Sequence, residues 1–157
     1  MFLTRADEAL PIGQLDYIAY KAIHGHFFQD VYDWTGSIRE IRTSKGGNPF
    51  CYPEHIDTQM TRVFMELAME DHLATAGSIA VFAQRASYYL SEINAIHPFR
   101  EGNGRCQLTL LSILADLSDI DFDEDLLNPD VFLSAMIASF FGDIDPLTDA
   151  MRVALKP

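Results

Sequence analysis

The segment His97–Arg105 reads HPFREGNGR and separates two stretches whose apolar residues repeat with helical spacing. Pro98 ends the first stretch, because a proline disfavours helical backbone in the residue before it. Gly102-Asn103-Gly104 allows a tight turn before the second stretch, so the first N–H groups of that helix have no partner inside it. The sequence therefore predicts two helices joined by a short loop, with a free N-terminus on the second helix.

Four features of this segment predict phosphate chemistry. A free helix N-terminus attracts anions, and Arg105 adds a guanidinium that suits phosphate oxygens. Glu101 offers a carboxylate to Mg²⁺, which usually binds one or two carboxylates together with phosphate oxygens. His97 supplies a base that is neutral near pH 7. Together they predict transfer of a phosphorus-containing group from a nucleotide, although each feature alone is more often structural.

No other nucleotide-binding signature competes with this segment. Lys45-Gly46-Gly47 lacks the frame of a P-loop, and Gly102-Asn103-Gly104 is followed by Arg105-Cys106-Gln107, which is not a Rossmann fingerprint. The candidate site therefore rests on the HPFREGNGR segment alone.

Helical spacing outside this segment predicts a mostly α protein. The helices expected are Gln14–Val31, Asp57–Leu73, Ser78–Ile96, Asn103–Leu117, Asp130–Phe141 and a shorter one near Leu147–Leu155. The exception is Ser37–Tyr52, where two short alternating runs flank the turn cluster Lys45–Pro49, so we expect a β-hairpin flap. An isolated hairpin is marginal in water, and this flap should be mobile unless something docks on it.

Length and composition predict one soluble domain spanning residues 1–157. The chain has 157 residues, 48% of them hydrophobic, which suits one core and excludes two catalytic domains. No apolar stretch reaches the roughly 20 residues of a membrane span, and the N-terminus does not resemble a signal peptide. Cys51 and Cys106 lie far apart, which favours a reducing compartment. We expect a cytoplasmic protein, or one secreted into a host cell by a dedicated system.

The charge balance argues against nucleic acid as a ligand. With 11 Lys+Arg and 23 Asp+Glu, the net charge is −12, which repels a phosphate backbone. We expect no sequence-independent binding to duplex nucleic acid, so any anionic ligand must be held locally.

The nine residues from His97 resemble the signature of the Fic family, H-x-F-x-[D/E]-[G/A]-N-[G/K]-R-x-x-R. The match is complete over these nine residues and fails at the last position, where this chain has Leu108. Upstream, Ile23–Arg39 resembles the family's passage from a helix into a flap, and Ser44–Phe50 resembles its target-docking flap. The resemblance covers roughly Leu15–Phe141 and implies a Fic-like helical bundle with a short β-hairpin flap.

The resemblance also implies a protein adenylyltransferase, which transfers AMP from ATP to a hydroxyl side chain of a target protein. His97 would deprotonate that hydroxyl, Glu101 would hold Mg²⁺ on the α- and β-phosphates, and Phe99 would anchor the loop in the core. The anion-binding turn and the β-phosphate contact would come from Gly102, Asn103, Gly104 and Arg105. The target would pair with the flap residues Lys45, Gly46, Gly47, Asn48, Pro49 and Phe50.

For small members of the family, the resemblance implies the toxin of a toxin–antitoxin pair with a small partner antitoxin. The family's inhibitory helix reads [S/T]-x-x-x-E-[G/N], and the nearest match is the poor one at Thr4–Ala9. We therefore predict no inhibition in cis.

Two alternatives remain open. Some relatives transfer a different moiety, and those resembling the Doc toxins carry Ala-Asn-Lys where this chain has Gly102-Asn103-Gly104, so the sequence here favours AMP. The second alternative is a nucleotide-binding regulator without turnover, because the Arg that Leu108 replaces would grip the γ-phosphate.

Other candidate residues favour structural roles. Two histidines on one helix, an acidic run and three apolar residues invite ligand interpretations, but packing or solvation is the simpler expectation. These are His24, His26, Asp119–Asp125, Phe132, Met136 and Phe140, of which the last three also offer a wall for adenine. Tyr32 and Trp34 are expected to be core anchors.

Overall fold

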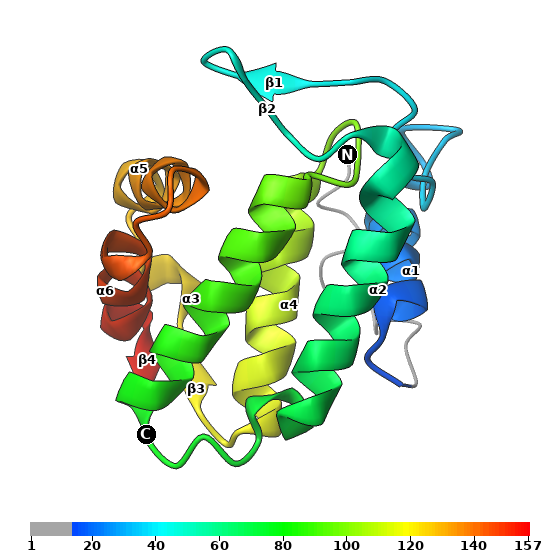
Figure 1. Ribbon diagram of the computed structural model, residues 1–157. Coiled ribbons are helices and arrows are strands. Elements are labelled where there is room, and N and C mark those ends of the chain that lie inside the picture. Colours follow the sequence, from blue (N-terminus) through cyan, green and yellow to red (C-terminus); the bar gives the residue numbers. More distant parts are fainter. Residues whose placement is uncertain (1–13) are drawn as a thin grey trace.

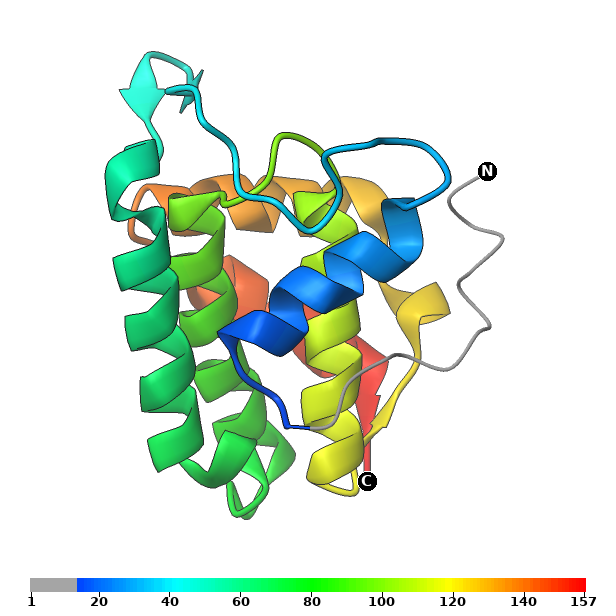
Figure 2. The same cartoon turned by 90° about the vertical axis from the view of Figure 1, so that its right-hand side faces the viewer.

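The computed structural model describes residues 14–157, and over this part of the chain it is a helical bundle (Figures 1 and 2). Its helices are α1 (Tyr17–Phe28), α2 (Pro53–Met69), α3 (Ile79–Ile96), α4 (Asn103–Leu117), α5 (Pro129–Phe140) and α6 (Asp145–Ala154), with 3₁₀ turns η2 (Asp71–Leu73) and η3 (Glu124–Leu126). The strands are β1 (Ser44–Lys45), β2 (Asn48–Pro49), β3 (Asp121–Phe122) and β4 (Leu155–Lys156). The predicted mostly α fold with a short hairpin flap is confirmed. The near match to an inhibitory helix lies outside the described residues.

Side-chain caps explain where several helices begin. The Ser78 hydroxyl accepts a hydrogen bond from the N–H of Val81 at the start of α3, and Asn128 caps α5 in the same way. The prediction for α2 starts a full turn too late, because Pro53 occupies the first helical position, where its missing N–H costs nothing. The same prediction also runs too far, since Asp71–Leu73 turns into left-handed backbone.

Helices α3 and α4 form the centre of the bundle, with α1 and α2 on one side and α5 and α6 on the other (Figure 1). The rings of Tyr20, Phe82 and Phe99 are fully buried in one continuous core. Burying such aromatic side chains removes a large apolar area from water and aligns the helices that carry them. The loop between α3 and α4 is thereby fixed to a packed pair of helices.

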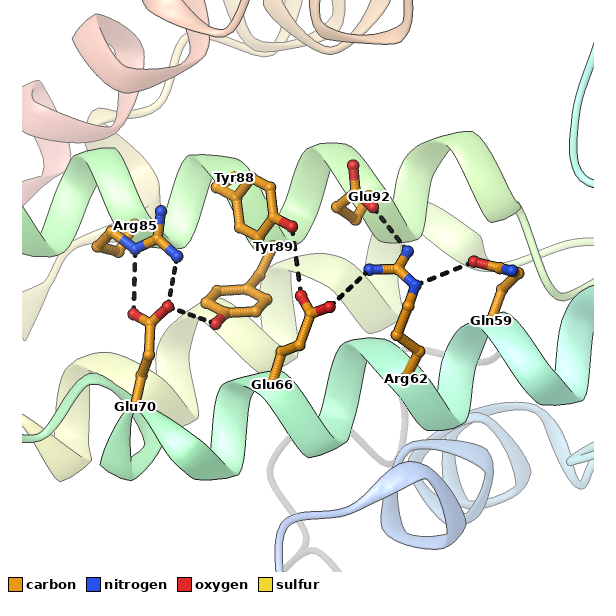
Figure 3. A network of polar contacts seen from close by, with 8 residues as sticks. All are labelled: Gln59, Arg62, Glu66, Glu70, Arg85, Tyr88, Tyr89 and Glu92. Atoms are coloured by element: carbon orange, nitrogen blue, oxygen red, sulfur yellow. Dashed lines mark hydrogen bonds and ion pairs between the residues drawn. The ribbon is translucent and has the colours of Figure 1, made fainter.

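A network of polar side chains joins α2 to α3 (Figure 3). Arg62 reaches Glu66 on its own helix and Glu92 on α3, and Arg85 of α3 pairs with Glu70. Gln59 and the hydroxyls of Tyr88 and Tyr89 complete it. Each partly exposed ion pair contributes only about 0–1 kcal/mol, but the shared partners fix how α3 lies along α2.

The flap is much shorter than the predicted hairpin Ser37–Tyr52. Its two strands pair only Ser44 with Pro49 and Lys45 with Asn48. The preceding residues 37–43 turn toward the bundle instead, because the buried Arg39 occupies backbone carbonyls with its side chain. The strand pairing that alternation predicts is therefore replaced by packing against the α3–α4 loop.

None of the described helices is long and apolar enough to cross a membrane.

Candidate functional site

The nine-residue segment lies at one end of the bundle, where α3 ends and α4 begins, and the flap extends beyond it (Figure 1). Figure 2 shows α5 running across the same end of the molecule. There Phe50, after the flap strands, contacts both His97 at the end of α3 and Phe140 of α5.

His97 ends α3 in a left-handed conformation, with φ 52° and ψ 64°. Its imidazole lies parallel to the ring of Phe50, with 4.1 Å between ring centroids and 9° between planes. Burial, and then the charges of Arg39 and Lys45, lower the pKa of His97 to about 4. The ring is therefore neutral near pH 7, which is the state that a general base needs.

Asn103 decides which imidazole nitrogen carries the lone pair. Its side-chain oxygen accepts from the N–H of Phe99, and its amide nitrogen donates to the Phe99 carbonyl, which fixes the orientation of the amide. That nitrogen lies 3.3 Å from Nε2 of His97. A donor at this position favours the tautomer with its lone pair on Nε2 and its proton on Nδ1.

The turn before α4 packs closely against α1. Gly102 has φ 84°, and a Cβ added there would lie 2.4 Å from Cε2 of Phe28. Only glycine fits this backbone at this distance. The glycine thus allows α4 to begin here without a side-chain cap, at the turn where the sequence predicts anion binding.

His24 packs against the α3–α4 loop, in the structural role that the sequence predicts for it. It is fully buried and stacks on Phe99 with 4.0 Å between ring centroids. Nδ1 accepts from the N–H of Gly36, so Nε2 carries the proton and donates to the Glu101 carbonyl. Burial lowers the pKa of His24, which keeps the ring neutral. His26 lies half-buried beside Phe27 and does not share this site.

Arg105, the predicted phosphate ligand, is bound by an acidic side chain. Its two terminal nitrogens each lie 3.0 Å from a carboxylate oxygen of Glu124 on η3. Sequence reasoning placed Glu124 in a solvated acidic loop and missed this contact. No short motif signals it, because the two residues are brought together by the fold of the Asp119–Asp125 segment.

Glu101 is exposed, as a residue that shares a cation with substrate must be. The described residues contain no group of three or more His, Cys, Asp or Glu side chains that could hold a metal by themselves. One carboxylate suits Mg²⁺ only when phosphate oxygens and water complete its shell. The residues present therefore fit Mg²⁺ that arrives with a nucleotide, and Glu101 is the residue that would hold it.

An apolar wall stands beside His97. Met136 and Phe140 of α5, with Phe50 and Lys45, line a cavity of about 70 Å³ next to the imidazole. Ligand pockets usually measure roughly 300–1,000 Å³, so this cavity is too small to hold a nucleotide base. Phe132, the third residue of the predicted wall, does not line this cavity but packs against the core.

Tyr32 packs against the core, as predicted, and Trp34 stacks on the buried His24 with 5.8 Å between ring centroids. Both are half-buried and stack on each other with 4.4 Å between centroids. The guanidinium of Arg100 lies 5.0 Å from the Trp34 ring centroid. This cation–π contact explains the exposed aromatic surface, because the cation covers it.

The sequence model of the Fic/DOC family matches residues 14–115. A probable protein adenylyltransferase of Sinorhizobium fredii is 56% identical over 152 residues, which cover 97% of this chain and 79% of that protein. The protein adenylyltransferase VbhT of Bartonella schoenbuchensis is 34% identical over 140 residues, which cover 89% of this chain and 29% of that protein.

Among solved structures, the Bartonella tribocorum effector BepC with bound AMPPNP has a TM-score of 0.84 at 20% identity. The alignment covers 99% of this chain and 81% of that one, and this likeness shows the fold. Together, the family match and the close relatives show that this chain belongs to the Fic/DOC family of enzymes, alongside relatives named protein adenylyltransferases.

Proposed function

We propose that the protein transfers AMP from ATP to a hydroxyl side chain of a target protein. The observation that carries the proposal is a neutral His97 held by Asn103 beside the free N-terminus of α4. A base, an anion-binding helix terminus and a carboxylate for Mg²⁺ within nine residues are the parts that nucleotidyl transfer needs. The relatives named protein adenylyltransferases support the same activity.

In the proposed mechanism, the target hydroxyl replaces the Asn103 amide as the hydrogen-bond donor to Nε2 of His97, and Nε2 takes its proton. The hydroxyl oxygen then forms a bond to the α-phosphorus of ATP while the bond from this phosphorus to the bridging oxygen of the β-phosphate breaks. Pyrophosphate leaves with the electron pair of the broken bond. The N–H groups at the start of α4 stabilise the charge on the phosphates, and Mg²⁺ held by Glu101 would neutralise part of it.

The flap is the proposed docking element for the target. Lys45 and Asn48 pair with each other and are exposed, so the outer edges of β1 and β2 are open to an added strand. Phe50, which directly follows β2, stacks on His97. A target segment paired with the flap is thereby carried next to the base.

Labelled ATP distinguishes the proposed reaction from its alternatives. Incubation of the purified protein with α-labelled ATP, Mg²⁺ and a cell lysate should label a protein band that is missing with His97→Ala, and γ-labelled ATP should label no such band. Mass analysis of that band should show the mass of AMP. Label from the γ-phosphate would identify a phosphotransferase, and no label from either would identify a regulator without turnover.

A flap deletion tests target docking separately. Removing Gly46–Asn48 should impair modification of the target protein more than binding of ATP, because these residues lie outside the α4 terminus. Equal loss of both would show that the flap builds the nucleotide site instead.

The proposed setting is that of a toxin with a small partner antitoxin. This part rests on the resemblance to small Fic toxins, and BepC is described as a translocated effector, so the target is sought in the producing cell or in a host cell. Expression in bacteria should arrest growth, and His97→Ala should not. Arrest by both proteins would remove the toxin proposal.

A further inference from the structure

Arg39 is a fully buried cation whose contacts are all with backbone carbonyls. Its side chain is 1% exposed. Nε donates to the carbonyl of His97 at 2.6 Å, and Nη2 donates to that of Ile96 at 3.0 Å. Nη1 donates to the carbonyl of Ile41 at 2.8 Å, and Nη2 also reaches that of Cys51. Within residues 14–157, the structure gives it no carboxylate partner.

A buried guanidinium without a counter-ion is costly unless its surroundings are negative. Arg39 meets this condition because it lies at the C-terminus of α3, where carbonyls have no partner inside the helix and the helix dipole is negative. Its planar fork reaches several carbonyls at once, which the single ammonium of a lysine does not do. The position therefore demands arginine.

The four carbonyls belong to the two parts of the site that must meet. Ile96 and His97 form the end of α3 that carries the base, whereas Ile41 precedes the flap and Cys51 follows it. Between the two flap contacts, Phe50 donates its N–H to Thr43 and lays its ring on the imidazole. One side chain thus fixes both ends of the flap relative to His97.

We propose that Arg39 is a positioning residue that holds the flap in register with the His97 base. The inference rests on the proposed function, in which the flap carries the target to that base. Arg39 does not touch the start of α4, so its replacement should leave ATP binding near normal and lower transfer to a protein. A shift on the order of 1 Å between reacting groups lowers rates about 100-fold; we expect a loss of about 10–100-fold at saturating ATP.

Two variants separate the geometry of the fork from its charge. Arg39→Lys keeps a cation but loses the fork, and Arg39→Gln loses both. Arg42→Gln is the matched control for the measurement of the His97 pKa described below. Arg42 is exposed on the same segment and contacts Glu54 and Tyr52 instead. Circular dichroism and thermal melts test whether each variant is folded. If Arg39→Gln does not fold, Arg39→Lys alone provides the test of the proposal.

Two of the measurements do not depend on activity. Amide hydrogen exchange at Phe50 and Cys51 should become faster in both Arg39 variants. An NMR pH titration follows the ring of His97, whose signal is identified by its absence in His97→Ala. Arg39→Gln should raise the pKa of His97, because a nearby positive charge is removed. Arg39→Lys and Arg42→Gln should leave this pKa low, with the remaining lowering due to burial and Lys45.

The expected result is slower transfer and faster exchange with an unchanged Kd for ATP. Unchanged transfer in a folded Arg39 variant would overturn the proposal. Parallel losses of transfer, ATP binding and thermal stability would also overturn it, since they indicate a structural role only. If the parent itself transfers no AMP, the proposed function fails alone, and the exchange rates with the titration still decide whether Arg39 positions the flap.

Discussion

Glu124 holds Arg105 with both of its carboxylate oxygens, each 3.0 Å from a terminal guanidinium nitrogen. The pair joins α4 to η3, and the two side chains are 30% and 45% exposed. If Arg105 binds the β-phosphate, a nucleotide must take this guanidinium from Glu124. On this proposal, Glu124 competes with the substrate for the one signature arginine that this chain retains.

Glu124→Gln should tighten ATP binding by about 1.4- to fivefold, because an exposed ion pair contributes roughly 0.2–1 kcal/mol. Isothermal titration with ATP and Mg²⁺ measures the change. Asp125→Asn is the control, since it removes a neighbouring exposed acid that does not contact Arg105. Equal tightening by both variants would mean that net charge, and not release of Arg105, is responsible.

His97→Ala should lower transfer by about 10²–10⁴-fold, the usual contribution of a positioned base. Binding of ATP should change little, because the N–H groups at the start of α4 do not involve the imidazole. Transfer rates and the Kd for ATP, measured on the same preparation, give both numbers. Turnover near that of the parent would remove the role assigned to His97.

Stability should fall as the pH drops from about 6.5 toward 5. The ordinary pKa of histidine is 6.5, that of folded His97 is about 4, and that of buried His24 is lowered as well. The unfolded chain therefore binds more protons in this window, and the stabilisation present above pH 6.5 is lost as the pH falls. We expect the free energy of unfolding to fall by about 1–2 kcal/mol by pH 5, after allowance for partial exposure of the rings.

Urea midpoints at pH 7, 6 and 5 measure this loss. The same series on His97→Gln should show a shallower decline, because one of the two neutral rings is gone. A flat profile in the parent would show that neither ring is held neutral by the fold.

Leu108→Arg should tighten ATP binding and raise transfer. Leu108 is half-buried on α4, three residues after Arg105, and is not part of the fully buried core, so an arginine there can keep its guanidinium in water. A charge-assisted contact with the γ-phosphate contributes roughly 1.5–3 kcal/mol, or about 10–100-fold in affinity. Leu117→Arg, exposed at the far end of α4, is the control. Equal ATP affinity of the two variants would contradict the inference that the parent lacks a γ-phosphate contact at position 108.

Gly102→Ala should destabilise the protein by about 1–3 kcal/mol and weaken ATP binding. The added Cβ would meet the ring of Phe28 at 2.4 Å, and the backbone has φ 84°. Gly77→Ala has a similar φ of 83° with nothing within 4 Å of its Cβ, so it isolates the effect of the backbone alone. Thermal unfolding compares the two variants, and equal losses would mean that Phe28 moves aside.

The sequence predicts the helices well because their boundaries depend on local chemistry. Ser78 and Pro98 bracket α3, and the glycine turn places the start of α4 correctly. The same reasoning fails at Ser37–Tyr52, where alternation suggests longer strands than the fold allows. The side chain of Arg39 competes there for backbone carbonyls, and residues distant in the sequence supply two of them.

The candidate site shows the same division. The nine-residue signature predicts roles for His97 and Glu101, because those predictions follow from residue type and spacing. The contacts of Glu124 with Arg105 and of His24 with the Glu101 carbonyl depend on which segments meet after folding. Neither contact leaves a pattern in the sequence, so only the structure reveals them.

The ring of Phe50 over His97 bears on how the proposed transferase limits hydrolysis of ATP by water. Water competes with every hydroxyl acceptor, and a base that solvent reaches freely would activate water as readily as a target. Phe50 shields one face of the imidazole and belongs to the segment that we propose receives the target. If docking of the target displaces Phe50, it uncovers the base, so we expect ATP alone to be hydrolysed slowly and the arrival of the acceptor to start the chemistry.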